Sequence, residues 1–163
     1  MSNIKIVKGN AIDALMNGEI DYLIHQTNCQ GKFASGIAGE IRKRIPAAYD
    51  AYMTCYNRCT FLQGKKHIPL GEISQGGGVI NLHSQLYYGY DKKRYTNYGA
   101  MAAGLQGVFY YLSDYDDNWQ SDITVGLPFG MGCGLGGGDW EIVYELIEHC
   151  LAPFVKEVTI YKL

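Results

Sequence analysis

Several features that mark other classes of protein are scarce in this 163-residue sequence. No apolar run approaches the ~20 residues of a bilayer span, and the N-terminus lacks a charged segment followed by an apolar one. We therefore expect a cytoplasmic protein without a membrane partner. The five cysteines have no disulfide-scaffold spacing, which agrees with a reducing compartment. The net charge of −2 predicts no broad basic surface for a nucleic acid.

One pair of cysteines is a candidate for metal binding. Cys55 and Cys59 are close in sequence, and His67 is the nearest further ligand type. No second Cys/His pair stands at zinc-finger spacing, so we expect free thiols on a helix. Neither a metal nor another cofactor is expected.

Glycine and tyrosine are abundant, with 21 and 14 residues. The densest glycine stretch, Gly126–Asp139, follows the β-branched run 123–125 and precedes a helical pattern. Glycine lets the backbone approach a ligand closely, and free N–H groups ahead of a helix bind anions. We interpret the stretch as a phosphate-binding loop with Asp139 as the helix cap. A flexible glycine linker is the alternative, but the apolar Met131 and Leu135 favour a packed loop.

Strand-like and helix-like segments alternate along the chain without a repeat or a linker. Strands are expected at 4–8, 21–26, 72–73, 79–85, 123–125 and 157–161, and helices at 11–16, 37–45, 47–59, 98–113 and 140–151. This order predicts one α/β domain over residues 1–163, with a mostly parallel sheet and helices on both faces. An acidic surface loop is expected at 114–121, and we expect a monomer.

Three predicted strands end in polar or glycine-rich loops, after Ile24, Leu82 and Val125. Because the carboxyl ends of parallel strands meet at one edge of a sheet, these loops predict one elongated cleft for a nucleotide-like ligand. The loop after Ile24 leads through the small residues 34–39 into a helix, which makes a second anion site and suits a diphosphate. Asn28 in this loop is either a ligand contact or a turn residue that bonds its own backbone.

Four separated motifs resemble the macrodomain family. They are Ile6–Asn10, Ile24–Cys29, Ser35–Ala38 and Gly132–Trp140, and the resemblance covers essentially the whole chain. Within this family, the sequence most resembles the branch that contains the yeast ADP-ribose 1″-phosphate phosphatase, the terminal ADP-ribose glycohydrolase and the DarG antitoxin. Similar small proteins occur in bacteriophages. The resemblance implies a single macrodomain, a three-layer α/β/α sandwich with a mixed, mostly parallel central sheet.

The resemblance also implies an ADP-ribose pocket. Asn10 stands where the family usually has an Asp that accepts from the adenine amino group, and Asn28 matches a contact to the distal ribose. Phe129, Tyr87 and Tyr88 are alternative packing partners for the ligand. The expected ligand-binding residues are Asn10, Ala11, Asn28, Ser35, Gly36, Ile37, Ala38, Ser84, Phe129, Met131, Gly132, Cys133, Gly134, Leu135 and Gly136.

The hydrolytic residues of related enzymes are missing at the matching positions. Ala38 replaces the Asp of the MacroD-type hydrolases, and Gly136 replaces an Asp of the glycohydrolase. Gln85 replaces the Lys that the glycohydrolase and DarG use.

His25 remains as a candidate, because it matches a His of the yeast phosphatase and imidazole exchanges protons near neutral pH. We expect His25 and Asn28 to be catalytic. A core or capping role is the alternative for His25, and His83 is a second, weaker candidate.

The function favoured by this pattern is ADP-ribose binding with hydrolysis of ADP-ribose 1″-phosphate to ADP-ribose and phosphate. The alternatives are a binding module without turnover, and removal of ADP-ribose from modified macromolecules. ADP-ribose or its 1″-phosphate is the expected partner, and the near-neutral charge argues against a nucleic acid.

Overall fold

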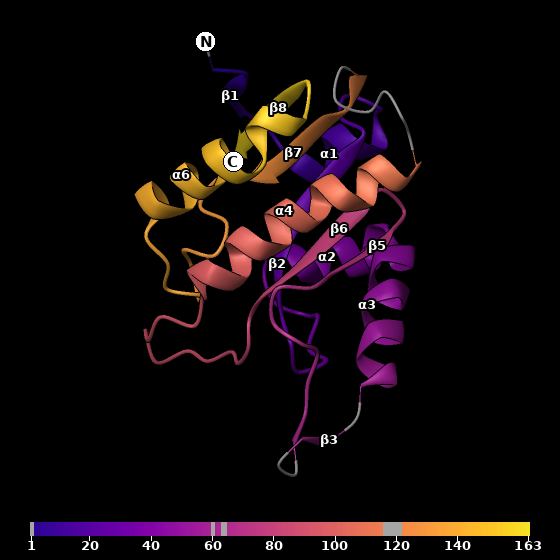
Figure 1. Ribbon diagram of the computed structural model, residues 1–163, viewed down its shortest axis with the longest axis vertical. Helices are drawn as coiled ribbons and strands as arrows, with labels where there is room; N and C mark the ends of the chain where they lie inside the picture. The colour runs from indigo at the N-terminus through magenta and orange to yellow at the C-terminus, as the bar shows by residue number, and fades with distance from the viewer. Residues whose placement is uncertain (1, 60, 63–64, 116–121) are drawn as a thin grey trace.

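The computed structural model of the chain describes residues 2–59, 61–62, 65–115 and 122–163 (Figure 1). In chain order the elements are β1 (Ile4–Lys8), α1 (Ala11–Met16), β2 (Tyr22–Asn28), α2 (Ile37–Arg44), α3 (Pro46–Arg58), β3 (Phe61–Leu62), β4 (Lys65–Lys66), β5 (Ile73–Gly76), β6 (Val79–Gln85), α4 (Tyr98–Tyr115), β7 (Thr124–Pro128), α6 (Trp140–Cys150), η1 (Ala152–Phe154) and β8 (Glu157–Lys162). Every predicted strand and helix has a counterpart. Of the predicted acidic loop, residues 114–115 end α4, and residues 116–121 lie outside the described residues.

The described residues form a central sheet with the strand order β1-β8-β7-β2-β6-β5. Neighbouring strands are parallel except β5 and β6, which form an antiparallel hairpin. The short β3 and β4 pair with each other as a separate antiparallel ribbon. The predicted α/β sandwich with a mixed, mostly parallel sheet is confirmed.

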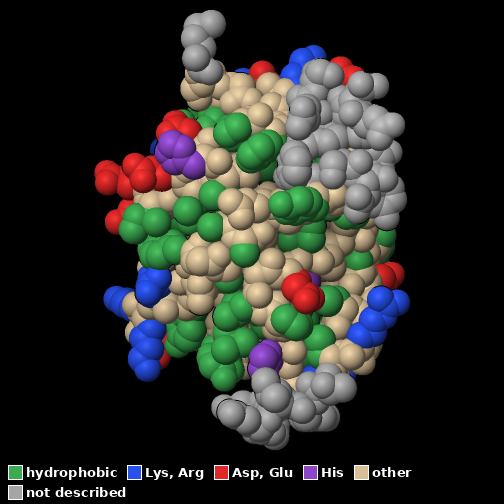
Figure 2. All heavy atoms as spheres, in the orientation of Figure 1, with side chains coloured by type: hydrophobic (Ala, Val, Ile, Leu, Met, Phe, Trp, Pro, Cys, Tyr) green, Lys and Arg blue, Asp and Glu red, His purple; other side chains and the backbone are tan. Residues whose placement is uncertain are grey.

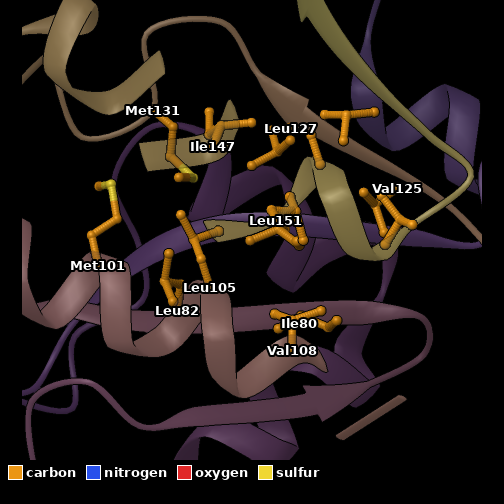
Figure 3. Packing of buried hydrophobic residues seen from close by; sticks show 14 of the residues in the cluster. Ile80, Leu82, Met101, Leu105, Val108, Val125, Leu127, Met131, Ile147 and Leu151 are labelled. Carbon is orange, nitrogen blue, oxygen red and sulfur yellow. The ribbon is translucent and has the colours of Figure 1, made fainter. Parts of the chain in front are cut away.

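Two groups of buried side chains hold helices against the two faces of the sheet. One group lies under α4 and α6, which Figure 1 shows in front of the sheet. Figure 3 shows Leu105 and Val108 of α4 beside Leu82 and Ile80 of β6. The other group lies under α1, α2 and α3. Among the helices that the structure describes, none combines the length and apolar character of a membrane span.

Strand β2 shows how the covered sheet dictates its sequence. Leu23 belongs to the core under α1–α3 and Ile24 to the core under α4 and α6, and both are fully buried. Successive side chains of a strand point to opposite faces, so a strand covered on both faces is apolar on both. β2 continues beyond the predicted end at Gln26 because Asn28 still pairs with Gln85 of β6.

Side-chain caps fix where α1 and α6 begin. Asn10 Oδ1 accepts from the N–H of Ile12 at 2.8 Å and of Asp13 at 3.1 Å. Asp139 Oδ1 accepts from the N–H of Glu141 at 2.9 Å, which confirms the predicted cap. These bonds satisfy N–H groups that have no partner inside a helix.

Candidate functional site

A cleft of about 450 Å³ opens at the carboxyl ends of the adjacent strands β7, β2 and β6. The loops predicted to converge there do so. The predicted binding residues that line it are Asn28, Ser35, Gly36, Ile37, Ala38, Phe129, Met131, Gly132, Gly134, Leu135 and Gly136. Further lining residues, which are not among the expected ligand-binding residues, include Thr27, Lys32, Ala34, Gly89, Tyr90 and Gly130.

The first glycine loop delivers the N-terminus of α2 to the cleft. Gly36 is the N-cap residue, with φ of 58° and ψ of −135°, a conformation that side-chain-bearing residues rarely adopt. No side chain caps this helix end. Among the described hydrogen bonds, the N–H groups of Ile37 and Ala38 therefore have no protein acceptor. Such N–H groups at the positive end of a helix dipole attract anions.

The second glycine loop, residues 130–138, brings further backbone donors to the same cleft. Two tight turns shape it, closed by the bonds Cys133 N–H to Gly130 O (2.8 Å) and Gly137 N–H to Gly134 O (3.0 Å). The N–H groups of residues 134, 135 and 136 make no protein hydrogen bond among those described. The cleft thus combines unpaired backbone donors from two loops.

Asn28 both lines the cleft and organises the loop beneath it. Its Oδ1 accepts from the N–H of Gln30 at 2.9 Å and from the hydroxyl of Tyr52 at 2.9 Å. Its Nδ2 donates to the carbonyl of Lys32 at 2.9 Å. The turn interpretation of Asn28 therefore holds, and its side-chain amide already has protein partners.

His25 does not reach the cleft. Its side chain is fully buried, and its ring meets that of Phe33 edge-on at 5.4 Å between centroids. Its Nε2 pairs with Oδ1 of Asn81 at 2.7 Å. Burial lowers the pKa of His25 to about 4, against a smaller opposing effect of the Asn81 hydrogen bond. The imidazole is neutral at pH 7 and has no exposed surface, which matches the core alternative rather than an acid/base role.

His83 lies in the same buried layer. Its Nε2 pairs with the hydroxyl of Ser74 at 2.9 Å, and its ring contacts that of Tyr52. Burial, followed by the nearby His25, lowers the pKa of His83 to about 4. Among the described residues, the Nδ1 atoms of both histidines are buried without a hydrogen-bond partner. This layer faces α3 and supports the sheet.

Four other predicted binding residues lie outside the cleft lining. Asn10 uses its side-chain oxygen to cap α1, and Ala11 is buried. Ser84 is buried beneath the cleft and donates to Oε1 of Gln26 at 2.6 Å. Cys133 points its thiol at the carbonyl of Met131, and burial raises the pKa of that thiol.

Gln26 and Gln85 also line the cleft, although the sequence predicts no ligand-binding role for either. The only indication in the sequence is that each is a polar residue at the end of an otherwise apolar predicted strand. Thr96, which supports the second loop from below, gave no sequence signal at all.

Aromatic and apolar side chains form the rim of the cleft. Tyr88, Tyr90, Phe129 and Leu135 are exposed there, with Tyr90 69% accessible. Phe129 packs against Trp140 with 4.7 Å between ring centroids, so its ring is held in place. Of the stacking alternatives, Phe129 and Tyr88 line the cleft and Tyr87 is not among the lining residues.

The charge of the cleft suits an anion. Lys32 is the single charged side chain among the described lining residues, which include no carboxylate and no imidazole. On the face that Figure 2 shows, Lys and Arg side chains lie at the edges, in several places next to Asp or Glu, and the coloured part of this face carries no broad patch of one charge. The arrangement can hold a phosphate through backbone donors and one cation, but it offers no paired acid and base.

A second hollow, of about 740 Å³, lies between α3 and β5 and includes Cys55, Cys59 and His67 in its lining. Although it is larger, its described lining residues include no glycine, and none of them lies at a helix N-terminus. Within the part of the chain that the structure describes, no group of three or more His, Cys, Asp or Glu residues is placed to hold a metal ion. The thiols are free, and burial raises the pKa of Cys55.

No protein-family profile matches this sequence. A phage protein resembles it weakly along nearly its full length. The uncharacterized 17.5 kDa protein in the tk-vs intergenic region of Enterobacteria phage T4 is 21% identical over 151 residues, which are 89% of this chain and 88% of that protein.

Solved structures show the fold more clearly. A protein of unknown function from Bacteroides thetaiotaomicron has a TM-score of 0.77 and 24% identity, with 99% of each chain covered. The macrodomain of Mycobacterium tuberculosis DarG has a TM-score of 0.68 and 21% identity, covering 99% of this chain and 98% of that one. Thermosipho africanus DarTG in complex with ADP-ribose has a TM-score of 0.67 and 16% identity, covering all of this chain and 42% of that one. The chain has the macrodomain fold.

Proposed function

We propose that the cleft binds ADP-ribose and that the backbone N–H groups of the two glycine loops hold its diphosphate. The observation that carries this proposal is the pair of unpartnered donor sets, one at the N-terminus of α2 and one at residues 134–136. A diphosphate presents several anionic oxygens over a short distance, and two donor sets on one cleft match that pattern.

The remaining parts of the cleft fit the uncharged parts of this ligand. Phe129 and Tyr88 supply ring faces that pack on a base or a ribose, and the other lining side chains are mostly small or apolar. The fold supports the same proposal, since DarTG of Thermosipho africanus shares it and was solved in complex with ADP-ribose.

Binding without turnover is the function that the geometry supports best. Hydrolysis needs a group that takes or gives a proton within hydrogen-bond reach of the reacting atom. The described cleft lining has no carboxylate or imidazole, and His25 is buried under Phe33. Hydrolysis of ADP-ribose 1″-phosphate is the second candidate, favoured by Asn28, which lines the cleft at the end of β2, the strand that also carries His25.

Calorimetric titration with ADP-ribose tests the binding proposal. A matched pair of variants, Gly134→Asp and Gly134→Asn, isolates charge from size, because a Cβ at Gly134 meets no atom within 4 Å. We expect micromolar binding to the unaltered protein, a loss of about tenfold or more with Asp, and a clearly smaller loss with Asn. Equal losses in the two variants, or no binding at millimolar ADP-ribose, would overturn the diphosphate assignment.

Phosphate release from ADP-ribose 1″-phosphate tests the second candidate. The assay compares the unaltered protein with His25→Gln, whose side-chain amide still offers a donor to Asn81. We expect release at the background rate for both. Turnover that His25→Gln abolishes, in a variant that still binds ADP-ribose, would replace the binding function by the phosphatase.

A further inference from the structure

We propose that Gln26, acting with Thr96, is a positioning residue that holds the second glycine loop in its ligand-binding shape and links it to the aromatic rim. The ligand part of this inference rests on the proposed ADP-ribose function. The structural part concerns the free protein alone.

The side-chain amide of Gln26 is fully engaged beneath the cleft. Its Oε1 accepts from the hydroxyl of Ser84 at 2.6 Å. Its Nε2 donates to Oε1 of Gln85 at 2.8 Å and to Oγ1 of Thr96 at 2.9 Å. Since both amide hydrogens and the oxygen have partners, the side chain has one satisfied orientation. Gln26 thus joins the end of β2 to the end of β6 and to the segment before α4.

Thr96 passes this constraint to the loop. Its Oγ1 donates to the carbonyl of Gly132 at 2.7 Å, and its backbone N–H donates to the carbonyl of Gly136 at 2.9 Å. The N–H of Tyr95 donates to the same Gly136 carbonyl at 2.7 Å. The two anchored carbonyls, at 132 and 136, bracket the free N–H groups of residues 134, 135 and 136. Fixing the carbonyls therefore fixes where the intervening donors lie.

Gly132 and Gly136 are the points where the loop rests on this support. A Cβ at Gly136 would lie 2.6 Å from Thr96 Oγ1 and 2.9 Å from Gln26 Nε2. A Cβ at Gly132 would lie 3.0 Å from both Gln26 Oε1 and Thr96 Oγ1. The loop backbone is in direct contact with the side chains of Gln26 and Thr96. A substitution of either residue should therefore alter the position of the loop backbone directly.

The same network reaches the opposite rim. Gln85 accepts from Gln26 and uses its own Nε2 to donate to the carbonyl of Tyr87 at 2.8 Å. The N–H of Tyr88 donates to Oε1 of Gln30 at 3.1 Å. A continuous chain of hydrogen bonds therefore runs from the aromatic segment 87–90 through Gln26 to the second loop.

The test uses substitutions that keep shape and remove one function. Thr96→Val loses the hydroxyl at constant size, Thr96→Ser keeps it, and Gln26→Leu removes the amide. Ser74→Ala is the control, because it deletes hydrogen bonds to Asn81 and His83 in the buried layer away from the cleft. Amide hydrogen exchange of residues 130–138 is measured in the free protein, and ADP-ribose affinity by calorimetry.

We expect Thr96→Val and Gln26→Leu each to raise exchange about tenfold at the hydrogen-bonded amides of Cys133, Gly137 and Gly138, and to weaken ADP-ribose binding about tenfold. Thr96→Ser keeps the hydroxyl, so its loop exchange and its affinity for ADP-ribose should stay near those of the unaltered protein. The double variant that combines Thr96→Val with Gln26→Leu should lose no more affinity for ADP-ribose than the more affected single variant, because both residues act through one network. Ser74→Ala lowers stability but leaves exchange of the loop and affinity near those of the unaltered protein.

Unchanged loop exchange in both Thr96→Val and Gln26→Leu overturns the inference. So does an equal loss of affinity in Ser74→Ala, which would show a general effect of stability. If the unaltered protein binds no ADP-ribose, the proposed function fails, and the exchange measurements alone still decide whether Gln26 and Thr96 position the loop.

Discussion

The buried histidines predict a steep loss of stability in mild acid. His25 and His83 are fully buried in the layer under α3, and burial lowers the pKa of each from 6.5 to about 4. In the unfolded chain each imidazole regains its ordinary pKa. Between those two values the unfolded state binds more protons than the folded state, so the free energy of unfolding falls as the pH falls.

The size of the effect follows from the two pKa values. Going from about pH 7 to about pH 4.5, proton binding to the unfolded chain destabilises the fold by roughly 2 to 3 kcal/mol for each histidine, or roughly 5 kcal/mol for both. That loss is comparable to the whole stability of many domains. Carboxylates of ordinary pKa titrate mostly below about pH 5, so they contribute little in this window.

Urea denaturation followed by circular dichroism, at several pH values in this window, measures the loss. His25→Gln and His83→Gln each remove one titrating group and should each flatten the pH dependence by about half. Glutamine keeps an amide that can pair with Asn81 or Ser74. A stability that stays constant over the window, or a double variant with the pH dependence of the unaltered protein, would refute the reasoning.

Three further predictions address the loop, the core and a helix cap. Gly136→Ala places a Cβ 2.7 Å from the carbonyl oxygen of Gly132 and should weaken ADP-ribose about tenfold in calorimetry, whereas Gly107→Ala in α4, where a Cβ meets nothing within 4 Å, should not. Leu105→Ala, fully buried between α4 and β6, should cost about 2–5 kcal/mol in urea unfolding, and a cost below about 1 kcal/mol would contradict the packing described. Asp139→Ala should cost about 1 kcal/mol through the lost cap on Glu141 N–H, and Asp139→Asn should recover most of it.

The fold was predictable because its strongest patterns are local. The apolar runs of β2 and β6 predict strands that are covered on both faces, and Asp139 predicts the start of α6. The convergence of the glycine loops followed from parallel pairing, which sets the carboxyl ends of neighbouring strands at one edge.

The lining of the candidate cleft was predictable chiefly in its two glycine loops, where the backbone forms the surface. His25 lies one residue from Gln26, so strand alternation sends the two side chains to opposite faces, and Phe33 from the loop that follows β2 covers His25. The sequence alone did not show whether the side chain of His25 or that of Gln26 points toward the cleft. Asn10 had a local signal, since Asn directly before a helix is a common cap. Thr96 had none, because its partner Gly132 is 36 residues away.

Apart from Lys32, the donors assigned to the phosphates in this cleft are main-chain atoms, and that has a consequence for how its sequence can vary. Every residue except proline carries an N–H, so most side chains in the two loops can change without altering the number of donors. What must persist is the lack of a side chain at Gly36, Gly132 and Gly136, where φ is positive or space is missing. A saturation scan should therefore show intolerance at these glycines and wide tolerance at Leu135. Proteins that keep such a cleft can diverge until little but the spacing of their glycines is shared.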